Sequence, residues 1–322
     1  MKTTKQILAA GAVAAVALAG ATLGWTAGAA AQDYPSKPVT MIVTWNPGGS
    51  TDVIARLLAE PLGQQLGQPV AVVNTAGGGG SLGTQAALDA PKDGYTILAT
   101  TSGNHILTPL KNDVGYTYED FEPVGQVVAA NLILAVNADS PWKTLDDLVK
   151  DAKANPGKYT FGAVPSGMPH LTLNGLANAA GFEVVHVPQQ GGAPGATALL
   201  GGTVDMLPAN ASTVAANIKG GNMRGLAVFS EERDPAFPDI PTAKEQGFEV
   251  YGSPFVGVAV AKGVPPEVLA RLKDAVQKAA TDPDFQAKAL KTSTEITYLP
   301  AEAFGKVWAR DWNAYAPMLQ KK

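Results

Sequence analysis

The chain has 322 residues, with 24 lysines and arginines against 28 aspartates and glutamates, three histidines and no cysteine. This slightly acidic balance argues against nucleic acid as a partner and against adhesion to an anionic membrane surface. The lack of cysteine excludes a fold held by disulfides, and the length is sufficient for two domains that each have a hydrophobic core.

The first 31 residues have the pattern of a secretory signal peptide. Lys2 and Lys5 precede an Ala/Val/Leu run, and Ala29 and Ala31 are the small residues at −3 and −1 of a cleavage site. We expect a leader at 1–31 that is cleaved after Ala31, which leaves 22 basic against 28 acidic residues, a net charge of −6. An uncleaved anchor is the competing interpretation. No later segment is long and apolar enough to span a bilayer, so we expect export without membrane insertion.

Strand and helix patterns alternate through the first third of the mature chain. The run 39–43 lacks polar alternation and predicts a parallel strand that is buried on both faces. The pattern predicts strands at 39–43, 70–74 and 95–100 and helices at 52–66 and 81–89. This order is typical of a parallel sheet with helices on its faces. The apolar passage at 124–136 is too long for one ordinary strand, and we expect it to leave one domain and enter another.

A second α/β series follows, and three helices close the chain. Glycines just past the helices of this series are the expected stops. The pattern predicts strands at 159–163, 183–187, 203–207, 225–229 and 255–260, and helices at 169–180, 193–200, up to 219, 266–280, 284–291 and 301–319. Two crossings then give a discontinuous first lobe, 32–130 with 251–322, and a second lobe, 131–250. A cleft between the lobes is where domain closure would bury a ligand.

A glycine turn at 47–52 follows the first predicted strand directly. Ser50, Thr51 or Asp52 can cap the helix behind it, and the two glycines let a ligand approach the backbone. Unpaired N–H groups at the helix start would favour a carboxylate or a phosphate. An ordinary capped turn is the alternative, and this motif alone leaves it open. Trp45 lies at the carboxyl end of the strand, where it either stacks on a ligand or packs in the core.

Nucleotide and metal sites are not expected. The run 78–83 satisfies G-x-G-x-x-G, but the segment 97–100 lacks the acidic residue that would hold a ribose. His105, His170 and His186 are scattered and form no metal-binding spacing. The sequence therefore predicts neither a cofactor nor a metal.

An exported hydrolase is the alternative that needs weighing. Ser166 and His170 lie four residues apart, so a helix would place them on one face as nucleophile and base. The motif G-x-S-x-G is missing, and no spacing supports Asp205 as the third member. The other interpretation is that both side chains are polar donors at a helix start, lining a ligand loop.

Several segments together resemble one family, in its order and spacing. They are the stretches 34–39, 47–52, 93–96, 191–194, 201–205, 224–228 and 238–242. On these motifs the chain resembles the Bug family, the periplasmic substrate-binding proteins of tripartite tricarboxylate transporters. The resemblance covers essentially the whole mature chain.

The resemblance implies a non-enzymatic periplasmic binding protein of type II, with two α/β lobes that close on a small organic acid. Such a protein docks on a two-component membrane permease, and we expect a soluble monomer. A sensor subunit would use the same site and differ only in its partner.

The resemblance also implies which loops hold the ligand carboxylate. Carried over by position, these residues are Asn46, Gly49, Ser50, Thr51, Asp52, Thr101, Ser102, Ser166, Gly167 and His170. The chain departs from the family pattern at Trp45-Asn46, at Gln189-Gln190 and near Asn210, so we add Trp45, Gln190 and Asn210 as residues that set ligand identity. Fewer charges at these positions favour a monocarboxylate, or an aromatic or weakly polar acid, over citrate.

Overall fold

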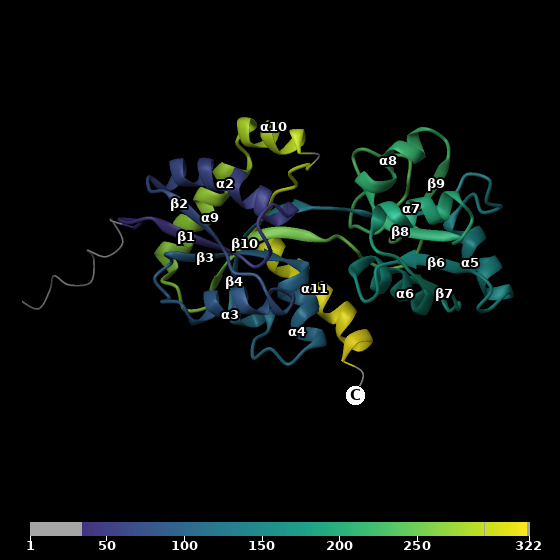
Figure 1. Ribbon diagram of the computed structural model, residues 1–322, viewed down its shortest axis with the longest axis horizontal. Helices are drawn as coiled ribbons and strands as arrows, with labels where there is room; N and C mark the ends of the chain where they lie inside the picture. The colour runs from purple at the N-terminus through teal and green to yellow at the C-terminus, as the bar shows by residue number, and fades with distance from the viewer. Residues whose placement is uncertain (1–33, 293, 321–322) are drawn as a thin grey trace, which may run out of the picture.

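The computed structural model describes residues 34–292 and 294–320, and the predicted leader lies outside them. Two separate sheets form its two lobes (Figure 1). Such a two-lobed α/β arrangement is the predicted fold class.

The first lobe is built on a six-stranded sheet in the order β11-β4-β10-β3-β1-β2. Its strands are β1 (Val39–Val43), β2 (Val70–Asn74), β3 (Thr96–Thr101), β4 (Phe121–Ala129), β10 (Phe255–Ala261) and β11 (Leu299–Pro300). β1 pairs in parallel with β2 and β3, whereas β10 is antiparallel to β3 and β4. The carboxyl ends of β1 and β3 therefore meet at one edge of the sheet.

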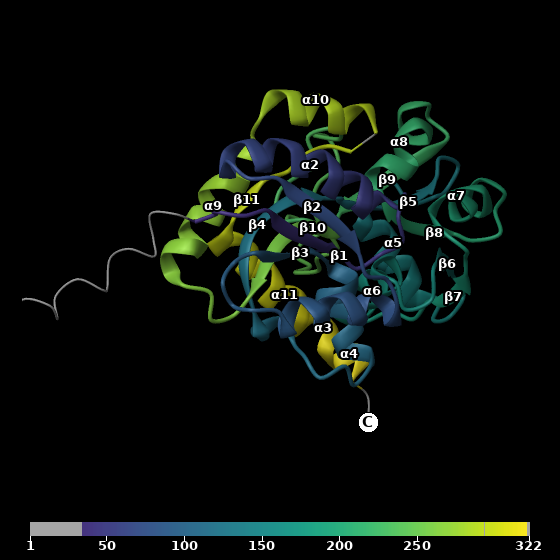
Figure 2. The same cartoon turned by 60° about the vertical axis from the view of Figure 1, so that its left-hand side comes forward.

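Helices cover both faces of this sheet. They are α2 (Ser50–Leu66), α3 (Ser81–Asp89), α4 (Thr108–Lys111), α9 (Pro266–Ala280), α10 (Pro283–Lys291) and α11 (Ala301–Leu319), with short helices η1 (Gly78–Gly80), η2 (Gly103–Leu107) and η3 (Tyr118–Asp120). Figures 1 and 2 place α2, α9 and α10 on one face and α3, α4 and α11 on the other. The two faces bury separate apolar clusters against the sheet.

The second lobe is built on a five-stranded sheet in the order β7-β6-β8-β5-β9. Its elements are β5 (Leu132–Asn137), α5 (Leu145–Ala154), β6 (Thr160–Ala163), α6 (Met168–Ala180), β7 (Val185–Pro188), α7 (Gly192–Leu200), β8 (Met206–Asn210), α8 (Ala211–Lys219) and β9 (Met223–Val228). β6 and β8 run parallel, so α6, α7 and α8 all begin at one edge of this sheet.

Most predicted elements are confirmed within one or two residues. The strand predicted at 203–207 exists but starts three residues later, because Thr203 donates its N–H back to Ala198 O and Asp205 binds Thr160. β8 therefore starts only at Met206. The apolar passage at 124–136 crosses from one sheet to the other as predicted, but it does so as two strands, β4 and β5, with a break at 130–131.

The chain passes between the sheets twice, at 130–131 and between 229 and 254. The two connections pair with each other: Ala130 N donates to Pro254 O at 2.8 Å, and Leu132 N to Gly252 O at 3.1 Å. None of the helices in the described part of the chain is long and apolar enough to cross a membrane.

Candidate functional site

The helix α2, which follows β1, begins without a side-chain cap. Gly49 is the N-cap of α2, and no side chain caps it, so the expectation that Ser50, Thr51 or Asp52 takes the cap position is wrong. Gly48 has φ +81°, a left-handed conformation that favours glycine. Val53 is the first residue of α2 whose amide finds a backbone acceptor, Gly49 O at 2.9 Å. The three preceding amides, 50–52, have no backbone acceptor among the described residues. Bare amides at the positive end of a helix dipole are a geometry that suits an anion, and we refer to residues 50–52 as the anion cradle.

The side chain of Asp52 holds this turn in place. Its Oδ2 accepts from Gly48 N at 2.8 Å and from Arg56 Nε at 3.0 Å, and its Oδ1 accepts from Asn74 Nδ2 at 2.8 Å. The Arg56 guanidinium is the main reason why the pKa of Asp52 falls to about 2. Because Arg56 neutralises this carboxylate, the cradle does not lose its attraction for an anion.

Trp45 and Thr101 meet beside the cradle, because β1 and β3 are neighbours. Trp45 Nε1 donates to Thr101 Oγ1 at 3.3 Å, and a Cβ on Gly103 would lie 2.9 Å from the indole ring. The half-buried indole is therefore fixed by protein contacts. Ser102 is buried and accepts from Phe255 N at 2.9 Å, which ties this loop to β10. Asn46 is exposed in the turn.

The second-lobe loop after β6 is held by a histidine. Ser166 has φ +54°, and its N–H donates to His170 Nδ1 at 2.9 Å. With Nδ1 accepting, the ring proton is on Nε2, which leaves an N–H donor. The ring stacks on His186 at 3.9 Å between centroids. Gly167 is the N-cap of α6 and has no side-chain cap.

This geometry contradicts the hydrolase alternative. The Nδ1 lone pair of His170 is occupied by the backbone of Ser166, so it does not activate the hydroxyl. Asp205 accepts from Thr160 N at 2.8 Å, at the start of β6, whereas Ser166 follows the end of that strand. Asp205 therefore lies at the opposite edge of the sheet and cannot orient the imidazole.

A cavity of about 100 Å³ opens between the starts of α6, α7 and α8. Its lining is Gly162, Ala163, Val164, Pro169, Gly191, Gly192, Leu207, Pro208, Ala209, Asn210 and Thr213. No ionisable side chain is among them. Asn210 Oδ1 is buried without a partner in the described part of the chain, and Gln190 is exposed beside the cavity's Gly191.

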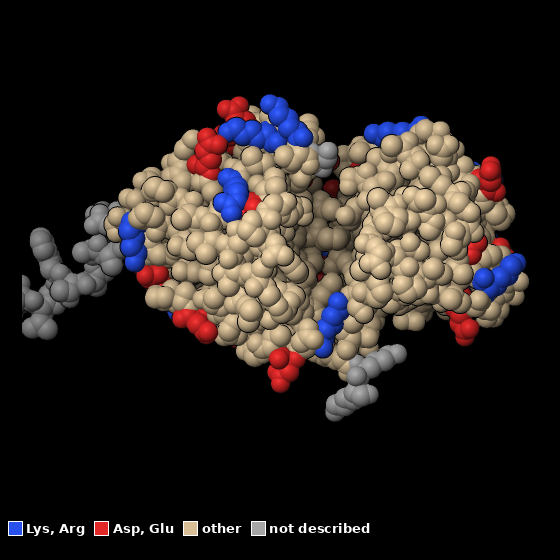
Figure 3. Space-filling view, in the orientation of Figure 1, with Lys and Arg blue, Asp and Glu red and all other residues tan. Residues whose placement is uncertain are grey.

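Lys111 joins the two lobes, and the sequence analysis missed it. Its Nζ, at the end of α4 in the first lobe, donates to the carbonyl of Ser166 in the second. Burial lowers the pKa of this lysine. The contact brings the second-lobe loop against the first lobe. Figure 3 shows a hollow between the two lobes with mostly uncharged walls. No local sequence signal marks such a contact between distant segments.

Comparison with known proteins decides the family. The profile of the tripartite tricarboxylate transporter family receptor matches residues 54–322. The protein BugT of Bordetella pertussis is 35% identical over 291 residues, which cover 88% of this chain and 89% of BugT. The chain belongs to this receptor family. It is therefore a periplasmic solute-binding protein of a transporter and not an enzyme.

Solved structures show the same fold. A TctC solute-binding protein from Polaromonas, without ligand, is 30% identical and superimposes with a TM-score of 0.84, over 90% of this chain and 100% of that chain. The R. palustris protein Rpa4515 with adipate is 26% identical, with a TM-score of 0.64 over 88% of this chain and 97% of that chain.

Within the described residues, no group of three or more acidic or histidine side chains is placed to hold a metal.

Because His170 is neutral in the folded receptor, we expect the free energy of unfolding to depend on pH. Burial, His186 and Lys111 lower its pKa from 6.5 to about 4. A base with a lowered folded-state pKa gives stability that is complete above pH 6.5 and is lost as the pH falls through about 4. The variant His170→Gln can still accept the Ser166 N–H and does not titrate.

Urea unfolding across this pH range should show a shallower fall in the free energy of unfolding for His170→Gln than for the unchanged protein. His105 is also buried, with a pKa of about 3, but it contributes equally to both proteins. Equal slopes would show that His170 is not the titrating group.

Proposed function

We propose that this receptor captures a small carboxylate-bearing ligand between its lobes and delivers it to a two-component permease. The observation that carries the proposal is the anion cradle at 50–52, where three amides at the start of a 17-residue helix lack backbone acceptors among the described residues. A carboxylate there would satisfy these donors and meet the positive end of the dipole.

The opposite wall of the cleft supplies the remaining contacts. We assign these contacts to the Nε2 donor of His170 and the amides around Gly167, because the neighbouring Ser166 binds His170 and accepts from Lys111 of the first lobe. We assign the ligand contacts to Trp45, Asn46, Gly49, Ser50, Thr51, Asp52, Thr101, Ser102, Ser166, Gly167, His170, Gln190 and Asn210. Asp52 takes part through its amide, because its carboxylate is bound within the turn.

The ligand end that faces the second lobe is uncharged in this proposal. The lining of the second-lobe cavity offers glycine, alanine, proline, aliphatic and amide groups, and no cation to pair with a second carboxylate. This favours a monocarboxylate or an aromatic or weakly polar acid over citrate. The relative Rpa4515 holds adipate, which has a carboxylate at each end, so the preference for a single charge rests on the lining of this chain alone.

The relative position of the two lobes matches that of a ligand-free relative better than that of a relative with a bound ligand. Two relatives of similar identity and coverage give TM-scores of 0.84 without ligand and 0.64 with adipate. A rotation of one lobe against the other lowers such a score without changing either lobe. We therefore infer that the described structure is the open form, which closes on its ligand.

The leader at 1–31 and the monomeric state are parts of the same proposal. Cleavage after Ala31 would release a chain that begins at Gln32, into the periplasm where the permease can be reached.

Thermal-shift screening of the mature protein against organic acids tests the function. Ligands that bind only the folded state raise the melting temperature, so monocarboxylates should stabilise the protein more than citrate does at equal concentration. Stabilisation by citrate alone would overturn the ligand class. No response to any acid, with binding of a neutral solute, would overturn the function.

A further inference from the structure

The C-terminal helix α11 belongs to the first lobe but reaches the second. Its first half is fixed to the first lobe: Phe304 is fully buried and packs edge-on against Phe255, at 5.0 Å between centroids. Trp308 packs against His105 at 4.0 Å between ring centroids, with the rings tilted by 54°. Figure 1 shows the second half of the helix running away from this lobe, below the connections and toward the second lobe.

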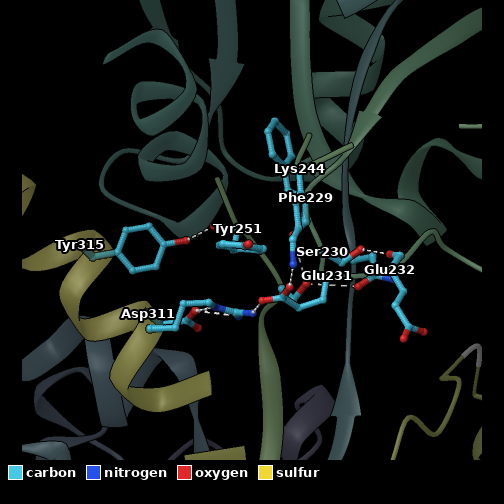
Figure 4. Close-up of polar contacts among 11 residues, drawn as sticks. Phe229, Ser230, Glu231, Glu232, Lys244, Tyr251, Asp311 and Tyr315 are labelled. Atoms are coloured by element: carbon cyan, nitrogen blue, oxygen red, sulfur yellow. Dashed lines mark hydrogen bonds and ion pairs between the residues drawn. The ribbon is translucent and has the colours of Figure 1, made fainter. Parts of the chain in front are cut away.

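The second half of α11 meets the second lobe through hydrogen bonds. The Tyr315 hydroxyl lies 3.2 Å from the Thr172 hydroxyl on α6 of the second lobe, and it donates to Tyr251 O, in the connection before β10, at 2.9 Å. Because Tyr315 is buried, its hydroxyl depends on these two partners for hydrogen bonds. Figure 4 shows Tyr315 and Asp311 projecting from α11 toward Tyr251 and Glu231.

A chain of charges runs beside this contact. Arg310 Nε and Nη2 donate to Asp311 Oδ1 at 2.9 and 2.8 Å, which fixes the guanidinium on α11. Arg310 Nη1 then lies 3.5 Å from Glu231 Oε1, in the segment that follows β9. The guanidinium also covers the Tyr251 ring at 4.6 Å, and Glu231 Oε2 lies 2.8 Å from Lys244 Nζ.

These contacts form a further link between the lobes, beside the two covalent connections and the contact of Lys111 with Ser166. Because α11 is fixed to the first lobe by Phe304 and Trp308, it must move with that lobe when the cleft closes. Its bonds to Thr172 and Glu231 belong to the second lobe, so a rotation of the lobes changes their lengths.

We propose that the second half of α11 is a clasp, made by Arg310 and Tyr315, that holds the lobes in the arrangement of this structure. Closure breaks the bonds to Glu231 and Thr172, and the clasp thereby opposes closing until a ligand bridges the walls. A ligand that closes the cleft must offset these bonds, so the clasp lowers the apparent affinity of the binding site. The proposal goes beyond the proposed function and does not depend on which ligand binds.

The distance between the lobes in the ligand-free protein tests the clasp. The natural chain has no cysteine, so Gln64→Cys on α2 and Ala216→Cys on α8 introduce unique sites for spin labels. Both positions are exposed, one on each lobe. Pulsed electron spin resonance then reports the distribution of lobe distances without any ligand.

The test variants remove clasp atoms with little change in size. Tyr315→Phe deletes only the hydroxyl, and Glu231→Gln removes the charge that faces Arg310. Each should raise the population at the shorter, closed distance about three- to tenfold, as expected for loss of one hydrogen bond, and the double variant should raise it further. The control Glu302→Gln removes an ion pair with Lys306 within the first half of the same helix and should change nothing.

An unchanged distance distribution in the double variant would overturn the proposal, and so would a shift to longer distances. Circular dichroism confirms that each variant is folded. Because no ligand is used, failure here would leave the proposed function untouched, and failure of the acid screen would leave the clasp untouched.

Discussion

Replacing Gly49 with valine should abolish ligand binding and leave the fold intact. A Cβ at this position meets only Asn46 O, at 3.4 Å, which is ordinary contact, and φ is −72°, so the backbone accepts a side chain. The valine methyl groups would occupy the space in front of the amides of the cradle. Loss of charge-assisted hydrogen bonds worth about 1.5–3 kcal/mol each should weaken binding by more than about 100-fold.

A second variant at Gly49 separates binding from stability. Serine is a better N-cap than valine, because its hydroxyl accepts from the N2 or N3 amide. Gly49→Ser should therefore stabilise the start of α2 and still weaken binding, because it occupies donors that the ligand needs. Calorimetric titration with an acid from the screen gives both affinities. Unchanged binding in both variants would remove the cradle from the site.

Replacing Phe304 with alanine should give the largest loss of stability. The side chain is fully buried and packs on the bare backbone of Gly257, where an added Cβ would lie 2.5 Å from its ring. It also contacts Trp308 edge-on at 4.9 Å between centroids. Truncation of such a phenylalanine costs about 3–5 kcal/mol. Urea unfolding should show this loss, and α11 should be the segment that gains hydrogen exchange.

The matched control is Leu290→Ala on α10. Leu290 is 67% exposed, so its truncation should change the free energy of unfolding by less than about 0.5 kcal/mol. A Phe304→Ala loss as small as that of the control would show that α11 is not anchored as described.

Elements with strong local signals were predictable. The buried strand β1, the helix α9 with proline in its first turn, and α11 lie where the patterns place them. The helix α5 was missed although Thr144 and Asp147 form a capping box, a signal that the sequence does carry. The short helix η2 is different. Its Asn104 side chain binds Thr84 and Thr101, contacts that exist only after the sheet forms.

The glycine turn of the candidate site was predictable from the sequence, whereas the contacts around it were not. The glycine turn marks the cradle, because a strand followed by Gly-Gly and a helix brings bare amides to the sheet edge. The binding of Asp52 by Asn74, which is 22 residues away, requires that β1 and β2 be neighbours. The contact between Lys111 and Ser166 depends on how the two lobes meet, which no local pattern encodes.

Titration of the mature protein with a stabilising carboxylic acid and with its primary amide tests the central claim most directly. Both compounds have the same shape, but only the acid carries the charge that the cradle at 50–52 favours. The account predicts one site per chain and an amide that binds about 10- to 150-fold more weakly than the acid. Equal affinity of the acid and its amide would contradict it.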